Sequence, residues 1–228
     1  MLAARSDTVQ RTLCALVGRG RLGHAATAVT RLNVTLAVKR LVRDLAARVP
    51  ELAHVDASRI LIVAGEARRA SRATIRPAHF DETRRRAGVG ARKKPLIRVK
   101  GRKVLYVITL RPLWFRAATP EERIGTIVHE LYHCSTRFDG TLHRGRVHSR
   151  LPLVAYNRRI RTLLARYLAA APEEIVRPFS ASGIVTARMW IERPVGFFRE
   201  GEYRGRRVYT ERQLFLGLVR MLSVPPRR

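Results

Sequence analysis

The chain contains few cysteines, few acidic residues and no long apolar run. Cys14 and Cys134 are its two cysteines, so neither a disulfide framework nor a CxxC metal site is expected, and a reducing cytoplasmic compartment fits this content. No stretch approaches the roughly 18 consecutive apolar residues of a membrane-spanning helix. Arginine and glycine repeatedly interrupt the first 25 residues. Neither a membrane span nor a signal peptide is therefore expected.

The shortage of acidic residues leaves the chain strongly positive. Its 228 residues include 46 basic and 17 acidic side chains, for a formal net charge of +29, and nearly all the basic residues are arginines. A bias toward arginine is compatible with a coding sequence rich in G and C. Arginine nevertheless stays charged and pairs with phosphate through two hydrogen bonds. Nucleic acid is therefore a plausible partner.

The remaining composition predicts one well-buried domain with appendages. Hydrophobic residues make up 46% of the chain, which is enough for a core. Residues 1–28 are basic and rich in glycine, so they predict a flexible arm. Residues 29–178 carry the helical and strand patterns of a domain, and residues 179–228 form an extension whose strands either enlarge that domain or make a small specificity module.

Periodicity and turn signals predict an α+β fold. The apolar spacing, with Pro50 and Pro172 as helix ends, predicts helices over residues 28–48, 119–135, 151–171 and 211–222. Short runs rich in β-branched residues predict strands over residues 59–64, 73–76, 96–100 and 103–110, and two more strands between residues 183 and 209. The strands flanking Gly101 are expected to form a hairpin. The basic residues 84–94 predict an exposed loop, which is either plain surface or a phosphate-binding segment.

The clearest local signal is the start of the second helix. Thr119 is a good N-cap, Pro120 suits the first helical position, and Glu122 lies three residues after the cap. This pattern predicts a capping box. The helix that it begins contains the sequence HELYH at residues 129–133.

That HExxH sequence is typical of metallopeptidases. His129 and His133 are four residues apart and therefore share one helix face, where both imidazoles can reach a single ion. Glu130 lies beside them as a candidate base. The apolar stripe centred on Ile127 lies on the opposite side of the helix, so the histidines are expected to face a cleft, covered by strand 103–110, with Gly125 leaving room.

A catalytic zinc ion needs a third protein ligand, for which the sequence leaves several candidates open. They are Asp139 at the metzincin spacing, Glu173 or Glu174 at a gluzincin-type spacing, and His143 or His148 after the Phe138-Asp139-Gly140 turn. Thr136 stands where metzincins have glycine, which weakens the case for Asp139. HExxH also arises by chance, and its histidines can then merely satisfy hydrogen bonds.

Three segments together resemble the phage metallopeptidase domain family, a group of small zincins similar in character to SprT-like proteases. These segments are TPEERIGTIVHELYH, FDGTLHRGRVHS and VAYNRRIRTLLARY, and the resemblance covers about residues 40–170. It implies a minimal zincin-like domain, in which a small mixed sheet packs on the HExxH helix and flanking helices. The residue pattern after position 183 adds a C-terminal β-hairpin and helix to this expected fold. The resemblance also implies Zn²⁺, His129, His133 and His148 as metal ligands, and Glu130 as the catalytic base. His143 departs from the arginine expected there and stays a rival ligand.

The expected function is zinc-dependent hydrolysis of a protein or peptide substrate by a metal-activated water, near nucleic acid. The alternative is a basic nucleic-acid-binding protein with a structural or inactive zinc site. Help for the oxyanion is expected from Tyr132, Tyr156, His143 or an arginine, among which the sequence does not choose. The aromatic residues Trp190, Phe197 and Phe198 are expected to pack in a core rather than contact substrate.

Overall fold

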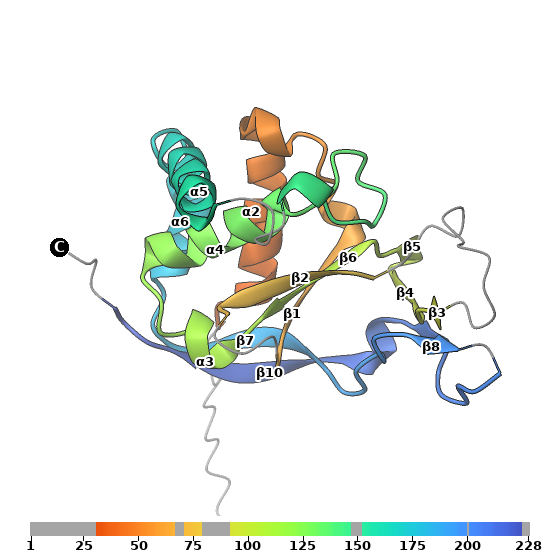
Figure 1. Ribbon diagram of the computed structural model, residues 1–228. Coiled ribbons are helices and arrows are strands. Elements are labelled where there is room, and N and C mark those ends of the chain that lie inside the picture. Colours follow the sequence, from red (N-terminus) through yellow and green to blue (C-terminus); the bar gives the residue numbers. More distant parts are fainter. Residues whose placement is uncertain (1–30, 67–70, 79–91, 147–151, 200, 225–228) are drawn as a thin grey trace, which may run out of the picture. The chain divides into compact units, whose positions relative to one another are not determined.

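The computed structural model describes residues 31–66, 71–78, 92–146, 152–199 and 201–224 (Figure 1). Residues 31–228 form one compact unit. The predicted N-terminal arm, most of the predicted basic loop and His148 lie outside the described residues. Within the described residues, no helix is long and apolar enough to cross a membrane.

The central sheet has three strands in the order β1–β6–β2. Strand β1 (Ile60–Ala64) pairs in parallel with β6 (Tyr106–Leu110), and β2 (Ala73–Pro77) pairs antiparallel with the other edge of β6. All five side chains of β1 are buried, as its continuous apolar run predicts. In β6, by contrast, fully buried and partly buried side chains alternate. Strand β2 is thus an outer strand of a mixed sheet.

The predicted hairpin exists, but its second strand divides into two. Strand β4 (Leu96–Val99) pairs with β5 (Arg102–Lys103) across a turn in which Lys100 and Gly101 both have positive φ. The chain then leaves the hairpin, and β6 joins the central sheet instead. The prediction of one continuous strand over residues 103–110 is therefore wrong. Residues 106–110 join the central sheet because their apolar side chains are buried there, between the two neighbouring strands β1 and β2.

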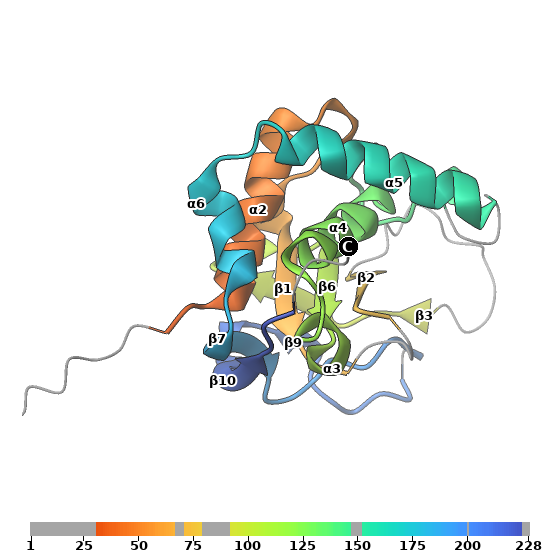
Figure 2. The ribbon, with the colours of Figure 1, turned by 90° about the vertical axis from the view of Figure 1, so that its left-hand side faces the viewer.

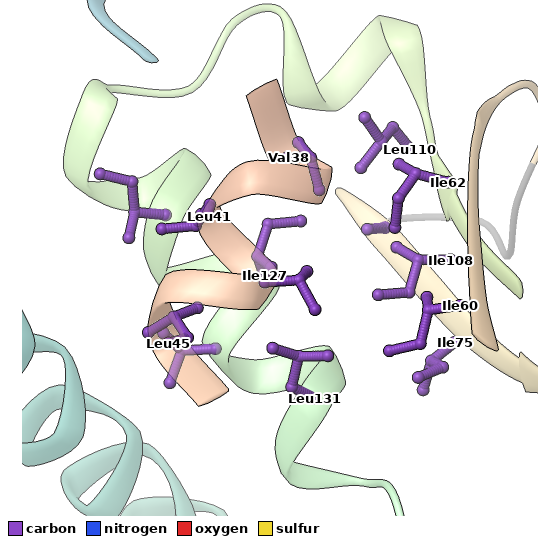
Figure 3. Packing of buried hydrophobic residues seen from close by; sticks show 14 of the residues in the cluster. Val38, Leu41, Leu45, Ile60, Ile62, Ile75, Ile108, Leu110, Ile127 and Leu131 are labelled. Carbon is purple, nitrogen blue, oxygen red and sulfur yellow. The ribbon is translucent and has the colours of Figure 1, made fainter. Parts of the chain in front are cut away.

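Two helices pack on one face of the sheet. Helix α2 (Val34–Arg48) is capped by Asn33, whose side chain accepts a hydrogen bond from the Leu36 amide, and helix α4 (Pro120–Tyr132) lies beside it. Side chains from both helices and all three strands meet in the main core, as Figure 3 shows. The first helix starts six residues later than predicted.

The remaining helices continue this α+β arrangement. Short helices are α3 (Pro112–Phe115) and α6 (Glu173–Val176), and the 3₁₀ turns are η1 (Pro50–Leu52), η2 (Ala57–Arg59), η4 (Arg144–Arg146), η5 (Arg177–Ser180) and η6 (Glu211–Gln213). The long helix α5 (Leu153–Leu168) packs against α4, and Figure 2 shows it running across that helix. A Cβ at Gly125 would lie 3.0 Å from the Leu164 Cδ2 atom. The space at Gly125 therefore serves the packing of α5.

The C-terminal residues differ most from the prediction. Thr210 does begin a capping box with Gln213, but it caps only η6, and residues 214–221 form strand β10 rather than a helix. Strand β10 (Leu214–Met221) pairs antiparallel with β7 (Gly183–Trp190) along its whole length. The predicted helix over residues 211–222 is wrong because pairing along a neighbouring strand outweighs local helix propensity, and Gly217 weakens a helix further.

The strands after residue 183 belong to the same packing as the rest. Val185, Ala187 and Met221 lie in the main core, and β7 lies against β1 and α2. Two short strands of this region pair with the preceding part of the chain: β8 (Phe198–Arg199) with β3 (Arg92–Lys93), and β9 (Val208–Tyr209) with β4. These strands thus extend the compact unit.

A buried arginine fastens the C-terminal residues to α4. The Arg123 side chain is only 1% exposed. Its guanidinium donates hydrogen bonds to the backbone carbonyl oxygens of Phe115, Arg116, Phe179, Ala181 and Leu222. Five acceptors satisfy a cation that burial would otherwise destabilise. Helix α4 is therefore held at its first turns from several directions.

The three aromatic residues of the extension have different surroundings. Trp190 packs beside a second, smaller core on the far face of the sheet, and Phe198 stacks on Tyr203 with a centroid distance of 4.7 Å. Phe197 is 51% exposed, so the expectation of core packing is wrong for this residue. Phe197 lies in an irregular segment, so no strand geometry turns its side chain toward a core.

Candidate active site

The predicted capping box fixes the start of α4. The Glu122 amide donates to Thr119 Oγ1 over 3.1 Å, and the Thr119 amide donates to Glu122 Oε2 over 3.0 Å. Both bonds satisfy backbone groups that the first turn of a helix leaves without helical partners. The helix is thus set in register from its first residue, and its last turn carries the HExxH sequence.

The two motif histidines converge. The Nε2 atoms of His129 and His133 are 3.3 Å apart, and the rings meet edge to face with centroids 4.9 Å apart. His133 follows the last residue of α4 but keeps helical backbone angles, which keeps it one turn above His129. Two nitrogens bound at about 2.0–2.1 Å to one tetrahedral zinc ion would lie roughly 3.3 Å apart. The pair therefore fits a shared metal ion.

The surroundings of His133 favour the tautomer that a metal requires. Its Nδ1 atom lies 2.7 Å from the carbonyl oxygen of Arg146. A carbonyl only accepts hydrogen bonds, so Nδ1 carries the proton and Nε2 presents its lone pair toward His129. The Arg146 guanidinium in turn lies over the Tyr132 ring, 4.1 Å from its centroid, and donates to the Tyr132 carbonyl oxygen. The loop after the motif is thus tied to the helix end.

Glu130 is buried beside the histidines. Its side chain is 7% exposed, and Oε2 accepts a hydrogen bond of 2.8 Å from the Ile75 amide. Burial raises the pKa of Glu130 to about 8, although the Ile75 hydrogen bond acts in the opposite direction. A carboxylate with a pKa near neutrality is well suited to accept and return a proton.

The strand beside the motif is β2, not the predicted strand 103–110. The Ile75 amide points away from β6 toward Glu130, as outward amides of an outer strand do. Helix α5 covers the other side, where the Tyr156 ring stacks on His133 with an interplanar angle of 18°. The expectation that residues 103–110 roof the site is wrong because β6 is the central strand and its inward side chains fill the main core.

The Tyr156 hydroxyl group lies directly at the histidine pair. It is 3.2 Å from His133 Nε2 and 3.4 Å from the carbonyl oxygen of His129. Burial, followed by the charge of Glu130, raises the pKa of the phenol. The hydroxyl group therefore keeps its proton at neutral pH and can donate a hydrogen bond within the site.

The candidate third ligands are not gathered at the pair. Within the described ranges, no three His, Cys, Asp or Glu side chains lie together so as to hold a metal ion. Asp139 Oδ1 accepts from the amide and hydroxyl of Thr141, and His143 Nδ1 accepts from the Gly145 amide. Glu173 and Glu174 are exposed in the first turn of α6. His148 lies outside the described residues.

The sequence did not indicate several neighbours of the site. The Ile75 amide and the Arg146 carbonyl are backbone groups, which no residue pattern identifies. Burial, together with the charges of Arg146 and His143 from the residues after the motif, lowers the pKa of His54. No motif connects His54 with residues so distant in sequence, and only the folded chain brings them near.

Comparison with known proteins agrees with this geometry. Residues 31–155 match the family described as "Putative phage metallopeptidase". The chain belongs to this phage metallopeptidase family. The matched residues exceed half of the chain and include α2, the central sheet and the whole of α4. No curated protein and no solved structure gives a significant match. The family resemblance expected from the sequence is confirmed, and membership supports metallopeptidase activity.

Proposed function

We propose that this phage metallopeptidase family member is a zinc-dependent peptidase whose metal is held by His129 and His133. The observation that carries this proposal is the 3.3 Å separation of their Nε2 atoms beside a buried carboxylate. Imidazole nitrogen is a preferred ligand of zinc, and two such donors with an adjacent base are the usual start of a hydrolytic site. His148 is proposed as the third ligand because the family resemblance implies a histidine directly before Ser149.

The reaction divides between the metal and the protein groups. A bound zinc ion would supply Lewis acidity toward a peptide carbonyl and toward water. Glu130 accepts the proton of the attacking water and delivers it to the leaving amine. The Ile75 amide holds Oε2, which fixes the plane of the carboxylate while its other oxygen exchanges the proton. The burial that raises the pKa of Glu130 helps the carboxyl group to hold the accepted proton until the leaving amine takes it.

Tyr156 is the group proposed to stabilise the oxyanion. Sequence alone left Tyr132, Tyr156, His143 and an arginine open for this role. The Tyr156 hydroxyl is near His133 Nε2 and stays protonated, so it can donate a hydrogen bond where negative charge develops. Tyr132 instead packs edge to face on Tyr156 and under Arg146.

The outer strand β2 is proposed to align the substrate. An extended peptide can add to a strand whose outward backbone groups are accessible from the side. The outward Ile75 amide is already bound to Glu130, so a peptide that pairs with the neighbouring outward groups of β2 would pass the base. This arrangement favours protein or peptide substrates over small molecules.

Metal removal tests the proposed function. Purified full-length protein should hydrolyse unfolded casein, lose this activity on dialysis against a chelator, and regain it with about one equivalent of zinc. The reason is that the metal supplies the Lewis acidity and the protein supplies only the base and ligands. The variants His129→Ala and His133→Ala should not recover. Tight zinc binding with no hydrolysis of any unfolded protein would instead favour a nucleic-acid-binding protein with a structural zinc site.

A further inference from the structure

A pocket lies on the face of the central sheet opposite α4. Its floor includes Val107 and Thr109, which alternate with the core-facing residues of β6. Its walls come from the end of β2, the start of β4 and residues 193–196 after β7. It contains about 530 Å³ of empty space, part of it open to solvent. Because this figure includes open solvent, the pocket is an open groove on the sheet rather than an enclosed cavity.

The charged residues that line the pocket are all basic. Arg76, Lys94 and Arg193 contribute to its walls, and no lining residue within the described part of the chain is acidic. The Lys94 ammonium donates to the Pro77 carbonyl oxygen, and an Arg193 nitrogen donates to the Glu66 carbonyl oxygen over 3.1 Å. Burial, together with the charge of Arg76, lowers the pKa of Lys94. A bound anion would offset the repulsion between the positive charges of Lys94 and Arg76.

An aromatic ring completes the pocket wall. Trp190 lines the pocket and is held in place by Tyr209, whose ring it meets edge to face at a centroid distance of 6.0 Å. Tyr209 is itself fixed by a 3.0 Å hydrogen bond to Glu192. A flat ring beside cationic side chains is an arrangement with which proteins hold single nucleotides and single-stranded nucleic acid.

We propose that this pocket binds a nucleotide unit, with its phosphate on Arg76, Lys94 and Arg193 and its base against Trp190. Arginine pairs with phosphate through two hydrogen bonds, and a base stacks on an indole ring. An acidic peptide would satisfy the cations but leave the tryptophan without a flat partner. The unit can come from a free nucleotide or from a single strand of nucleic acid, whose binding the net charge of +29 would also favour.

The proposed pocket and the histidine pair lie on opposite faces of the same sheet. Ile75 faces the main core and its amide contacts Glu130, whereas the next residue, Arg76, lines the pocket. Nucleic acid held in the pocket would therefore not cover the histidine pair. Nucleotide binding is therefore independent of hydrolysis and should be unchanged in a Glu130→Gln variant.

Tryptophan fluorescence tests this proposal in the full-length chain. The chain has two tryptophans, so a Trp114→Phe background leaves Trp190 as the sole reporter. Oligothymidylate and thymidine monophosphate should each quench Trp190, and the double variant Arg76→Glu/Arg193→Glu should weaken binding by about tenfold or more through loss of phosphate contacts. Each single charge reversal should give part of this loss of affinity.

Equal affinity per nucleotide for both ligands would identify a free nucleotide as the source, and much tighter binding of the oligonucleotide would identify a nucleic-acid strand.

The control is a reversal of equal charge outside the pocket. Arg98 and Arg212 are exposed and do not line it, so Arg98→Glu/Arg212→Glu changes the net charge by the same amount. This variant should bind within about twofold of the parent, since long-range attraction is screened by salt. The proposal would be overturned if both double variants lost the same amount of binding affinity. It would also be overturned if the ligands did not quench Trp190, or if polyglutamate quenched it equally strongly.

Discussion

Replacement of Glu130 by glutamine should reduce hydrolysis of a peptide substrate by about 10³-fold. Glutamine has nearly the same shape and can still accept a hydrogen bond from the Ile75 amide, but it cannot accept the proton of the attacking water. The two histidines are unchanged, so zinc content should stay near that of the wild type. The rate of hydrolysis, measured with a quenched fluorescent peptide, should therefore fall. The zinc content, measured by mass spectrometry of metals, should not.

Glu121→Gln is the matched control for this experiment. Glu121 lies in the first turn of the same helix but is exposed, and the variant removes one carboxylate as Glu130→Gln does. It should keep wild-type activity. Equal, trace-level hydrolysis by the wild type and by both variants would instead show that the observed cleavage comes from a contaminant.

The same carboxylate should destabilise the metal-free protein as pH rises. The folded state raises the pKa of Glu130 from 4.5 to about 8, so the folded protein binds a proton that the unfolded chain releases between these values. The contribution of Glu130 to the stability of the folded protein is therefore greatest below pH 4.5, and it falls as pH rises toward 8. From the shift, the stabilisation gained by Glu130→Gln should grow by about 3 kcal/mol between pH 5 and pH 8.

Urea denaturation of metal-free wild type and variant at several pH values measures this difference. The comparison between the two proteins cancels the histidines that titrate in the same range. Metal-free Glu121→Gln should instead differ from the wild type by the same small amount at every pH. A difference for Glu130→Gln that does not change with pH would contradict a raised pKa, and the carboxylate would then be ionised in the folded protein.

The features that the sequence predicted well depend on residues near one another in the chain. A threonine, a proline and a glutamate define the start of α4, because their bonds form within one turn. The convergence of His129 and His133 follows from helical spacing in the same way. Local geometry alone therefore supplied the helix and its metal-binding pattern.

The features that the sequence did not predict depend on distant partners. Residues 214–221 form a strand because β7 offers backbone hydrogen bonds along their whole length, which local propensity does not reveal. Arg123 lies in a basic chain as one arginine among many, and only the folded structure surrounds it with carbonyl oxygens. Similarly, Tyr156 reaches His133 because α5 crosses α4.

The position of bound zinc tests the central proposal most directly. Anomalous scattering from crystals of zinc-loaded protein should locate one ion about 2.0–2.1 Å from the Nε2 atoms of both His129 and His133, with His148 as the third protein ligand. The ion should lie on the Glu130 side of the pair. Zinc bound at other residues, with the two imidazole rings turned away from each other, would contradict the proposed site.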